Sequence, residues 1–335
     1  MNQAYDHYVA VDWSERNMAI ARMTPKAPGV KIIDVPSDIG ELKLYLRHLV
    51  GRKILVIEET TTAQWLYTEL EGEVDRLVVC DPYRNRLLSE GAKNDTIDAE
   101  KLVKLLRSGM VKEVYHGQGE FVELRRLASG YEDVVRAGVR LKNQRSALLR
   151  ACGKGVGGDG IGGCEGFVLE ELGRQIQDYE ETKAKYEKKF AEMAGRHPAI
   201  RHQMKMPGIA LINAVKVVSR VITAARFPNR GHYWSYCGLI KHEKMSGGRS
   251  YGKRTPRYSR TMKSVYKTAA LAAIGNDNEM RSYYDSLLAK GVAEHHARNA
   301  VARRIAQISW GVLKSGKPYH PSIRRAQGDS EQPGS

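Results

Sequence analysis

Residues 53–58 read Lys-Ile-Leu-Val-Ile-Glu, an unbroken apolar run that ends in an acid. A short apolar run of this kind is typical of a strand buried on both faces of a sheet. A second such run, Arg-Leu-Val-Val-Cys at 76–80, stops at Asp81-Pro82. The segment 62–70 between them has a helical pattern, so we expect two parallel neighbours joined by a right-handed crossover.

The chain before residue 53 predicts three successive strands followed by a helix, and the chain after residue 82 predicts one more helix. The strands are expected at 7–13, 17–23 and 31–35, and the helices at 39–49 and 95–108. This order, β-β-β-α-β-α-β-α, predicts a mixed five-stranded sheet of the α/β ribonuclease H-like class. A doubly wound nucleotide-binding fold would need a glycine fingerprint after the first strand, and Asp12-Trp13-Ser14-Glu15 stands there instead.

Two long amphipathic helices are expected over 118–150 and 165–195, as in a helical hairpin or coiled coil. The Gly-rich segment between them lacks the Gly-Lys-Ser/Thr ending of a phosphate-binding loop, so a flexible tip is expected. From residue 201 the pattern is mainly helical. The predicted division is 1–115, 116–200, 201–325 and a disordered tail at 326–335.

Charge is distributed unevenly along this chain of 335 residues and net charge +16. Residues 201–330 contain 24 Lys and Arg against 6 Asp and Glu. Such an excess indicates a polyanionic partner, most often nucleic acid. An anionic membrane surface is the rival, but the basic residues do not follow one amphipathic helix.

Composition excludes several other classes of protein. No run of 18 apolar residues is present, so no membrane span is expected. The start of the chain is not a secretory signal, so a cytoplasmic location is expected, with association to the nucleoid when the protein is bound to DNA. Four dispersed cysteines without a CxxC pair indicate neither a zinc site nor a disulfide framework.

Four acids are expected to converge at one edge of the predicted sheet. Asp12 ends the first strand and Glu58 ends the fourth, while Asp95 and Asp98 share one face at the start of the last helix. Each acid alone would be an ordinary surface or helix-capping residue. Together they repel one another unless cations neutralise them. Oxygen ligands of this kind suit Mg²⁺ or Mn²⁺, and two such ions can clamp a phosphodiester.

Glu59 is a second candidate beside Glu58. Strand alternation directs it to the opposite face, so Glu58 is preferred.

The acids within VDWSE, IEETT and KNDTIDAEKL, with VVCDP between the last two, resemble those of insertion-sequence transposases of family one-ten (IS110). The resemblance continues through MKMPGIALINAVKVV, FPNRGHYWSYCGL and KMSGGRSYGKR, and it covers residues 8–319. One departure is the absence of a proline soon after Gly238-Leu239. Members of this family are DNA recombinases whose first domain is related to the RuvC branch of the ribonuclease H fold.

The resemblance implies that Asp12, Glu58, Asp95 and Asp98 form a metal-binding tetrad, and that Ser246 is a nucleophile that links covalently to DNA. It also implies donor and target DNA as substrates, a bridge RNA as guide, and composite active sites in a homodimer or homotetramer. The basic residues around the serine are expected to contact nucleic acid, although any one of them could equally be a solvated surface charge; they are Lys244, Arg249, Lys253, Arg254, Arg257 and Arg260.

Three alternatives remain open. A site-specific invertase of the same family would have the same motifs. A metal-dependent nuclease or junction resolvase would need the acids but not Ser246. A nucleic-acid-binding protein with an inactive site would need neither.

Overall fold

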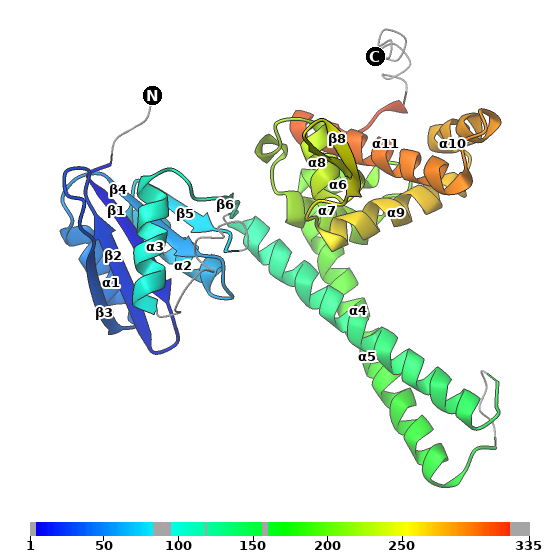
Figure 1. Ribbon diagram of the computed structural model, residues 1–335. Helices are drawn as coiled ribbons and strands as arrows, with labels where there is room; N and C mark the ends of the chain where they lie inside the picture. The colour runs from blue at the N-terminus through cyan, green and yellow to red at the C-terminus, as the bar shows by residue number, and fades with distance from the viewer. Residues whose placement is uncertain (1–4, 83–94, 118, 156–159, 322–335) are drawn as a thin grey trace. The chain divides into compact units, whose positions relative to one another are not determined.

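The computed structural model describes residues 5–82, 95–117, 119–155 and 160–321 (Figure 1). Part of the predicted flexible tip (156–159) and all of the predicted disordered tail (326–335) lie outside these residues. The side chain of Asp95 also lies outside them. The chain divides into two compact units, 1–118 and 119–335. The two predicted long helices and the basic C-terminal helices therefore belong to one unit.

The first unit is a six-stranded mixed sheet with helices on both faces. Its elements are β1 (His7–Trp13), β2 (Asn17–Met23), β3 (Lys31–Pro36), α1 (Ile39–His48), β4 (Lys53–Glu58), α2 (Ala63–Leu70), the 3-10 turn η1 (Glu71–Glu73), β5 (Arg76–Cys80), α3 (Asp95–Arg107) and β6 (Glu113–Val114). The strand order is β3-β2-β1-β4-β5-β6. Pairing is antiparallel among β1, β2 and β3 and parallel from β1 through β4 to β5, as predicted.

The expected count of five strands was wrong, because β6 adds a sixth strand at the edge. It pairs antiparallel with the end of β5 through Val79 with Val114 and Cys80 with Glu113. Two residues are too few to produce a period-two pattern, so no sequence signal marks this strand.

The two faces of the sheet bury different side chains because alternate residues of a strand point to opposite sides. Val9, Val11, Leu55 and Ile57 pack with buried leucines of α1 and α2. The other face, with Ala10, Ala19, Ala21, Val56 and Cys80, packs against Ala99, Leu102, Val103 and Leu106 of α3. The small alanines of β1 and β2 leave room for α3 to pack on this face, and Figure 1 shows α3 lying across the sheet.

The regular elements of the second unit, over its described residues 119–155 and 160–321, are helices and one β-hairpin. Its elements are α4 (Glu120–Ala151), α5 (Gly163–Arg196), α6 (Pro198–Met204), α7 (Leu211–Val221), the 3-10 turn η3 (Ala224–Arg226), α8 (Arg230–Tyr236), β7 (His242–Ser246), β8 (Arg249–Arg254), α9 (Arg260–Ile274), α10 (Glu279–Ala289) and α11 (Glu294–Ser315). The sequence predicted a mainly helical pattern from residue 201, and the hairpin β7–β8 is an exception to it.

One hydrophobic core joins the base of the α4–α5 hairpin to the C-terminal helices. Leu124, Tyr131 and Phe190 from the long helices belong to the same buried cluster as Tyr233 and Ile305. A hydrogen-bonded chain of buried polar groups crosses this core and links Gln203, Ser309, Tyr266 and Tyr233. Among the described residues, no helix has the length and apolar character needed to cross a membrane.

Candidate functional site

The end of the sheet at which β1 and β4 finish carries two of the four predicted acids. The parallel register pairs Val11 with Ile57, so Asp12 and Glu58, the next residue on each strand, occupy neighbouring positions. Both follow the alternation of Ala10 and Val56, whose side chains lie on the face that α3 covers. Both residues are partly exposed.

Helix α3 begins at this same end of the sheet. Its last residue, Arg107, donates hydrogen bonds to the carbonyl oxygens of Pro25 and Ala27 at 3.1 and 3.0 Å. That position lies just beyond Met23, which pairs with Tyr8 at the start of β1. Thirteen helical residues span about 20 Å, close to the length of a seven-residue strand. The first turn of α3 therefore reaches the end at which β1 and β4 finish.

Asp98 lies in that first turn. Its side chain is 30% exposed, and the Nζ atom of Lys101 lies 3.8 Å from its Oδ1 atom. Oδ1 itself is shielded from water and accepts no hydrogen bond. A buried carboxylate oxygen without a donor is costly, and a divalent cation would satisfy it. Oxygen donors of this type suit Mg²⁺ or Mn²⁺.

Asp95 opens α3, but its side chain lies outside the described residues. Within the part of the chain that the structure describes, no three His, Cys, Asp or Glu side chains form a cluster able to hold a metal ion. We refer below to Asp12, Glu58 and the first turn of α3 as the acid edge.

Glu59 is turned toward α2 and has a separate set of partners. Its Oε2 atom contacts Nε2 of His116, a side chain only 3% exposed. Nδ1 of His116 lies 3.0 Å from Oε1 of Gln64, and the ring stacks on Tyr67 with centroids 5.5 Å apart. Sequence reasoning did not find His116, because no spacing pattern relates it to Glu59.

Ser246 is the last residue of β7 and is exposed. The hairpin turn that follows is Gly247-Gly248, with φ of 56° and 76°. Positive φ at both central residues is the requirement of a type I′ turn, which glycine meets without strain. The turn therefore presents Ser246 opposite Arg249 at the tip of a two-stranded ribbon.

Basic and aromatic groups surround the serine on this ribbon. The Nζ atom of Lys244 lies 5.9 Å from the ring centroid of Tyr251, and cross-strand neighbours share a face of the hairpin. All six basic residues predicted to contact nucleic acid are exposed; Lys244, Arg249, Lys253 and Arg254 lie on the hairpin, Arg257 follows it, and Arg260 opens α9.

Cys237 lies close to the hairpin in sequence but is not a candidate nucleophile. Burial raises the pKa of its thiol above the ordinary value, so the thiol stays protonated near neutral pH. Ser246 is thus the exposed hydroxyl of the hairpin tip, and the nearest cysteine is a packing residue.

Two family profiles match the chain. A DEDD transposase profile of IS110 type, described as Transposase, matches residues 9–153. A profile described as Transposase IS116/IS110/IS902 family matches residues 200–285. The first match covers the mixed sheet except the first two residues of β1, and it implies the ribonuclease H-like fold for the first unit. The second covers the hairpin that carries Ser246.

Similar proteins occur on several insertion elements. An uncharacterized 43.6 kDa protein of insertion element IS110 from Streptomyces coelicolor is 27% identical over 154 residues, which are 46% of this chain and 38% of that protein. An uncharacterized 42 kDa protein of IS900 from Mycobacterium paratuberculosis is 28% identical over 165 residues, 48% of this chain and 40% of that protein. A 44.8 kDa protein of IS116 from Streptomyces clavuligerus is 25% identical over 118 residues, 35% and 30% of the two chains.

The aligned segments thus span 40% or less of each relative's own length. The family assignment rests on the two profiles, which match separate parts of the chain in the expected order. The chain belongs to the IS110 family of transposases.

Proposed function

We propose that this protein is the transposase of an insertion sequence and recombines donor and target DNA through metal-dependent cleavage and a phosphoserine intermediate. The observation that carries the proposal is the register of β1 and β4. It sets Asp12 and Glu58 side by side at the end of the sheet that the first turn of α3 reaches.

The proposed metal ligands are Asp12, Glu58, Asp95 and Asp98, which would hold one or two Mg²⁺ or Mn²⁺ ions. When bound, such ions polarise a phosphodiester and stabilise the charge that develops on its oxygens. The shielded Oδ1 atom of Asp98, for which the described part of the chain supplies no hydrogen-bond donor, supports this assignment.

Ser246 is the proposed nucleophile. As its Oγ–P bond forms, one P–O bond of the DNA backbone breaks; the serine gives up its proton and the leaving sugar oxygen takes one up. No change of oxidation state occurs, and attack by a free DNA hydroxyl on the phosphoserine reverses the step on a new partner strand. The exposed hairpin tip supports this role, because a substrate as large as a duplex can reach it. Arg249 and Lys244 would offset the phosphate charge.

The family resemblance adds two parts to the proposal. A bridge RNA would select the donor and target sequences. The acids of one subunit would act with the serine of another in a dimer or tetramer.

A recombination assay tests the proposal. Donor and target plasmids, with the native flanking DNA transcribed, are combined with wild type, Asp12→Asn, Ser246→Ala and Ser250→Ala. Ser250 is the matched control, because it lies on the same hairpin opposite Met245. We expect Asp12→Asn and Ser246→Ala to be inactive and Ser250→Ala to be active. Denaturing gels should show DNA attached to the wild type and none attached to Ser246→Ala.

Other outcomes would assign a different function. Cleavage by Ser246→Ala but not by Asp12→Asn would indicate a metal-dependent nuclease or junction resolvase. Nucleic-acid binding without cleavage by the wild type would indicate an inactive site. An invertible segment in the flanking DNA, in place of mobile-element ends, would indicate an invertase.

Metal binding is tested separately from activity. MgCl₂ should raise the thermal midpoint of the wild type, because a ligand that binds the folded state stabilises it. Asp12→Asn should lose most of that rise. An equal rise in both proteins would contradict the ligand assignment.

A further inference from the structure

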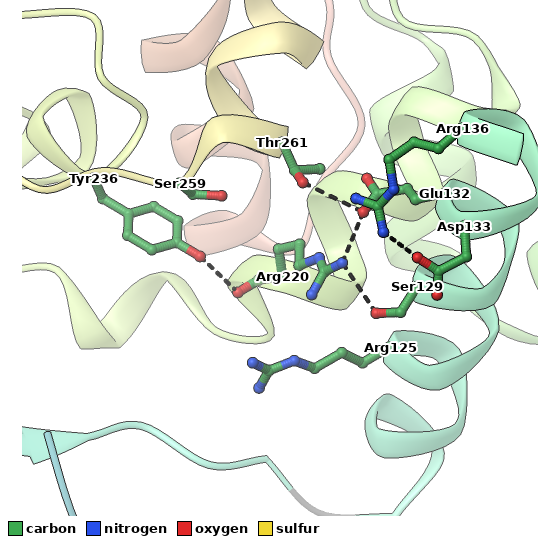
Figure 2. Close-up of a pocket in the computed structure, with 9 residues that line it drawn as sticks. All are labelled: Arg125, Ser129, Glu132, Asp133, Arg136, Arg220, Tyr236, Ser259 and Thr261. Atoms are coloured by element: carbon green, nitrogen blue, oxygen red, sulfur yellow. Dashed lines mark hydrogen bonds and ion pairs between the residues drawn. The ribbon is translucent and has the colours of Figure 1, made fainter. Parts of the chain in front are cut away.

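A pocket of about 480 Å³ in the second unit is not used by the proposed chemistry. It opens between α4, the end of α7 and the start of α9 (Figure 2). Three arginines line it, Arg125 and Arg136 from α4 and Arg220 from α7. The remaining lining is polar, and hydroxyl groups of four residues contribute to it. A polar, arginine-lined pocket is suited to an anion rather than to an apolar ligand.

Arg220 is held in place from several sides. Its Nη2 atom donates to Oε2 of Glu132 at 2.9 Å and to Oγ of Ser129 at 3.0 Å. Its carbonyl oxygen accepts from the hydroxyl of Tyr236 at 3.3 Å. Its Nε atom is shielded from water and has no hydrogen-bond partner. The two hydrogen bonds of Nη2 therefore orient the guanidinium in advance.

The charges around the pocket leave a positive surplus. Glu132 is more buried than Asp133, the other acid of the pocket. Two cations offset the charge of Glu132: Arg220, and Lys216, whose Nζ atom lies 3.7 Å from Oε1 of Glu132. Arg136 pairs with Asp133 three residues before it on α4. Counting Lys216 with Arg220 and Arg136, three cations face these two acids. A surplus of about one positive charge remains, and it favours an anion at this position.

Arg136 can move to a ligand at little cost. The Arg136–Asp133 pair is exposed, at 73% and 65% of its two side chains, and exposed ion pairs contribute little to stability. Figure 2 shows Arg125 extending from α4 on the side of the pocket below Arg220. A fixed guanidinium, an adaptable one and the side chain of Arg125 thus border the same space.

We infer that this pocket, which shares no residue with the acid edge or the β7–β8 hairpin, binds a backbone phosphate of the nucleic-acid partner. The inference rests on the proposed function for its partner. Guanidinium groups match phosphate oxygens with paired hydrogen bonds. A purely structural cluster would need neither the surplus positive charge nor the open volume.

Equilibrium binding tests this inference. The full chain carrying Ser246→Ala is titrated with a 20-base-pair duplex DNA and with a single-stranded RNA of the same sequence, by fluorescence anisotropy over a range of salt concentrations. The pocket variant is Arg125→Gln/Arg136→Gln. The matched control is Arg126→Gln/Arg140→Gln, which removes two charges from exposed positions of the same helix outside the pocket.

We expect the pocket variant to bind about tenfold more weakly than the control near physiological salt. The slope of log K against log salt should be smaller by about one phosphate contact. Loss with the RNA alone, the DNA alone or both would support the site and identify which nucleic acid supplies the phosphate.

Equal affinities of the two double variants for the probes, whether or not they are weaker than that of the parent Ser246→Ala chain, would overturn the pocket assignment and leave the proposed function intact. Failure of the parent Ser246→Ala chain to bind either probe would overturn both the pocket assignment and the proposed function. Thermal unfolding checks that each variant is folded. Should the pocket variant be unfolded, Arg136→Gln against Arg140→Gln makes the same comparison at exposed positions, with the same expected direction.

Discussion

The buried polar chain in the core of the second unit provides a quantitative test of how that unit is held together. Ser309 is fully buried. Its hydroxyl donates to Oε1 of Gln203 at 2.7 Å and accepts from the hydroxyl of Tyr266 at 2.7 Å. The hydroxyl of Tyr266 also lies 2.5 Å from that of Tyr233. Ser309→Ala removes the central member and leaves buried groups on both sides.

The expected cost follows from what each neighbour loses. Gln203 loses the Ser309 hydroxyl, which donates to its Oε1 atom, while Tyr266 retains its contact with Tyr233. A buried polar group left without a partner costs about 1–3 kcal/mol. Because Tyr266 keeps one partner, we expect about 2–4 kcal/mol in total. For a unit of this size each kcal/mol lowers the thermal midpoint by about 2–4 °C, so the expected fall is about 4–16 °C.

Calorimetry of the full chain, with tryptophan fluorescence as a second probe, measures this change. Ser286→Ala is the matched control, since Ser286 is exposed on α10, and it should change stability by less than about 0.5 kcal/mol. Burial raises the pKa of Tyr233 and Tyr266 well above the ordinary value, so the loss should not vary with pH near neutrality. Equal midpoints for Ser309→Ala and Ser286→Ala would refute the reasoning.

Two further predictions concern helix packing and acid stability. Gly138→Ala should lower the free energy of unfolding by about 1–3 kcal/mol through overpacking, because an added Cβ would lie 2.3 Å from the ring of Tyr179. Gly173→Ala, at a position with open space around it, should raise the free energy of unfolding by about 0.5–1 kcal/mol. Chemical denaturation measures both changes, and changes of the same sign would contradict the packing of α4 against α5. The hydrogen bond from Arg47 lowers the pKa of Glu73, so their pair stabilises the fold above the unfolded pKa of about 4 and loses that contribution as the pH falls through the folded pKa. Arg47→Gln should therefore lower the thermal midpoint at pH 7 and make progressively less difference in acid, whereas a pH-independent difference would contradict this assignment.

Most of the fold was predictable because its signals are local. The apolar run of β4, the alternation in β1 and the long amphipathic patterns of α4 and α5 each fall within one element. The order of these elements along the chain then restricts the topology, since a helix between two neighbouring strands makes them parallel through a right-handed crossover. The exceptions were β6 and the β7–β8 hairpin. Their pairing depends on contacts with a neighbouring strand rather than on an internal period.

In the candidate site, too, the contacts set by local signals were predictable and those between distant segments were not. Asp12 and Glu58 were predictable as neighbours because both end parallel strands, and the register of β1 and β4 agrees. The partners of Glu59 were not predictable, because His116 lies 57 residues away. The arginine pocket combines side chains of α4 and α7 that lie 84 to 95 residues apart, so no motif connects them.

The sequence by itself determined the order of elements, the position of each acid on its element, the basic character of the C-terminal part and the resemblance that places Ser246 in a Ser-Gly-Gly turn. These properties depend on period, composition and neighbours in the chain. Only the tertiary structure decided that Glu59 pairs with His116, that the serine stands on an exposed ribbon, and that three arginines share one polar pocket. Those arrangements depend on which distant surfaces pack together, and a single sequence carries no local signal for that choice.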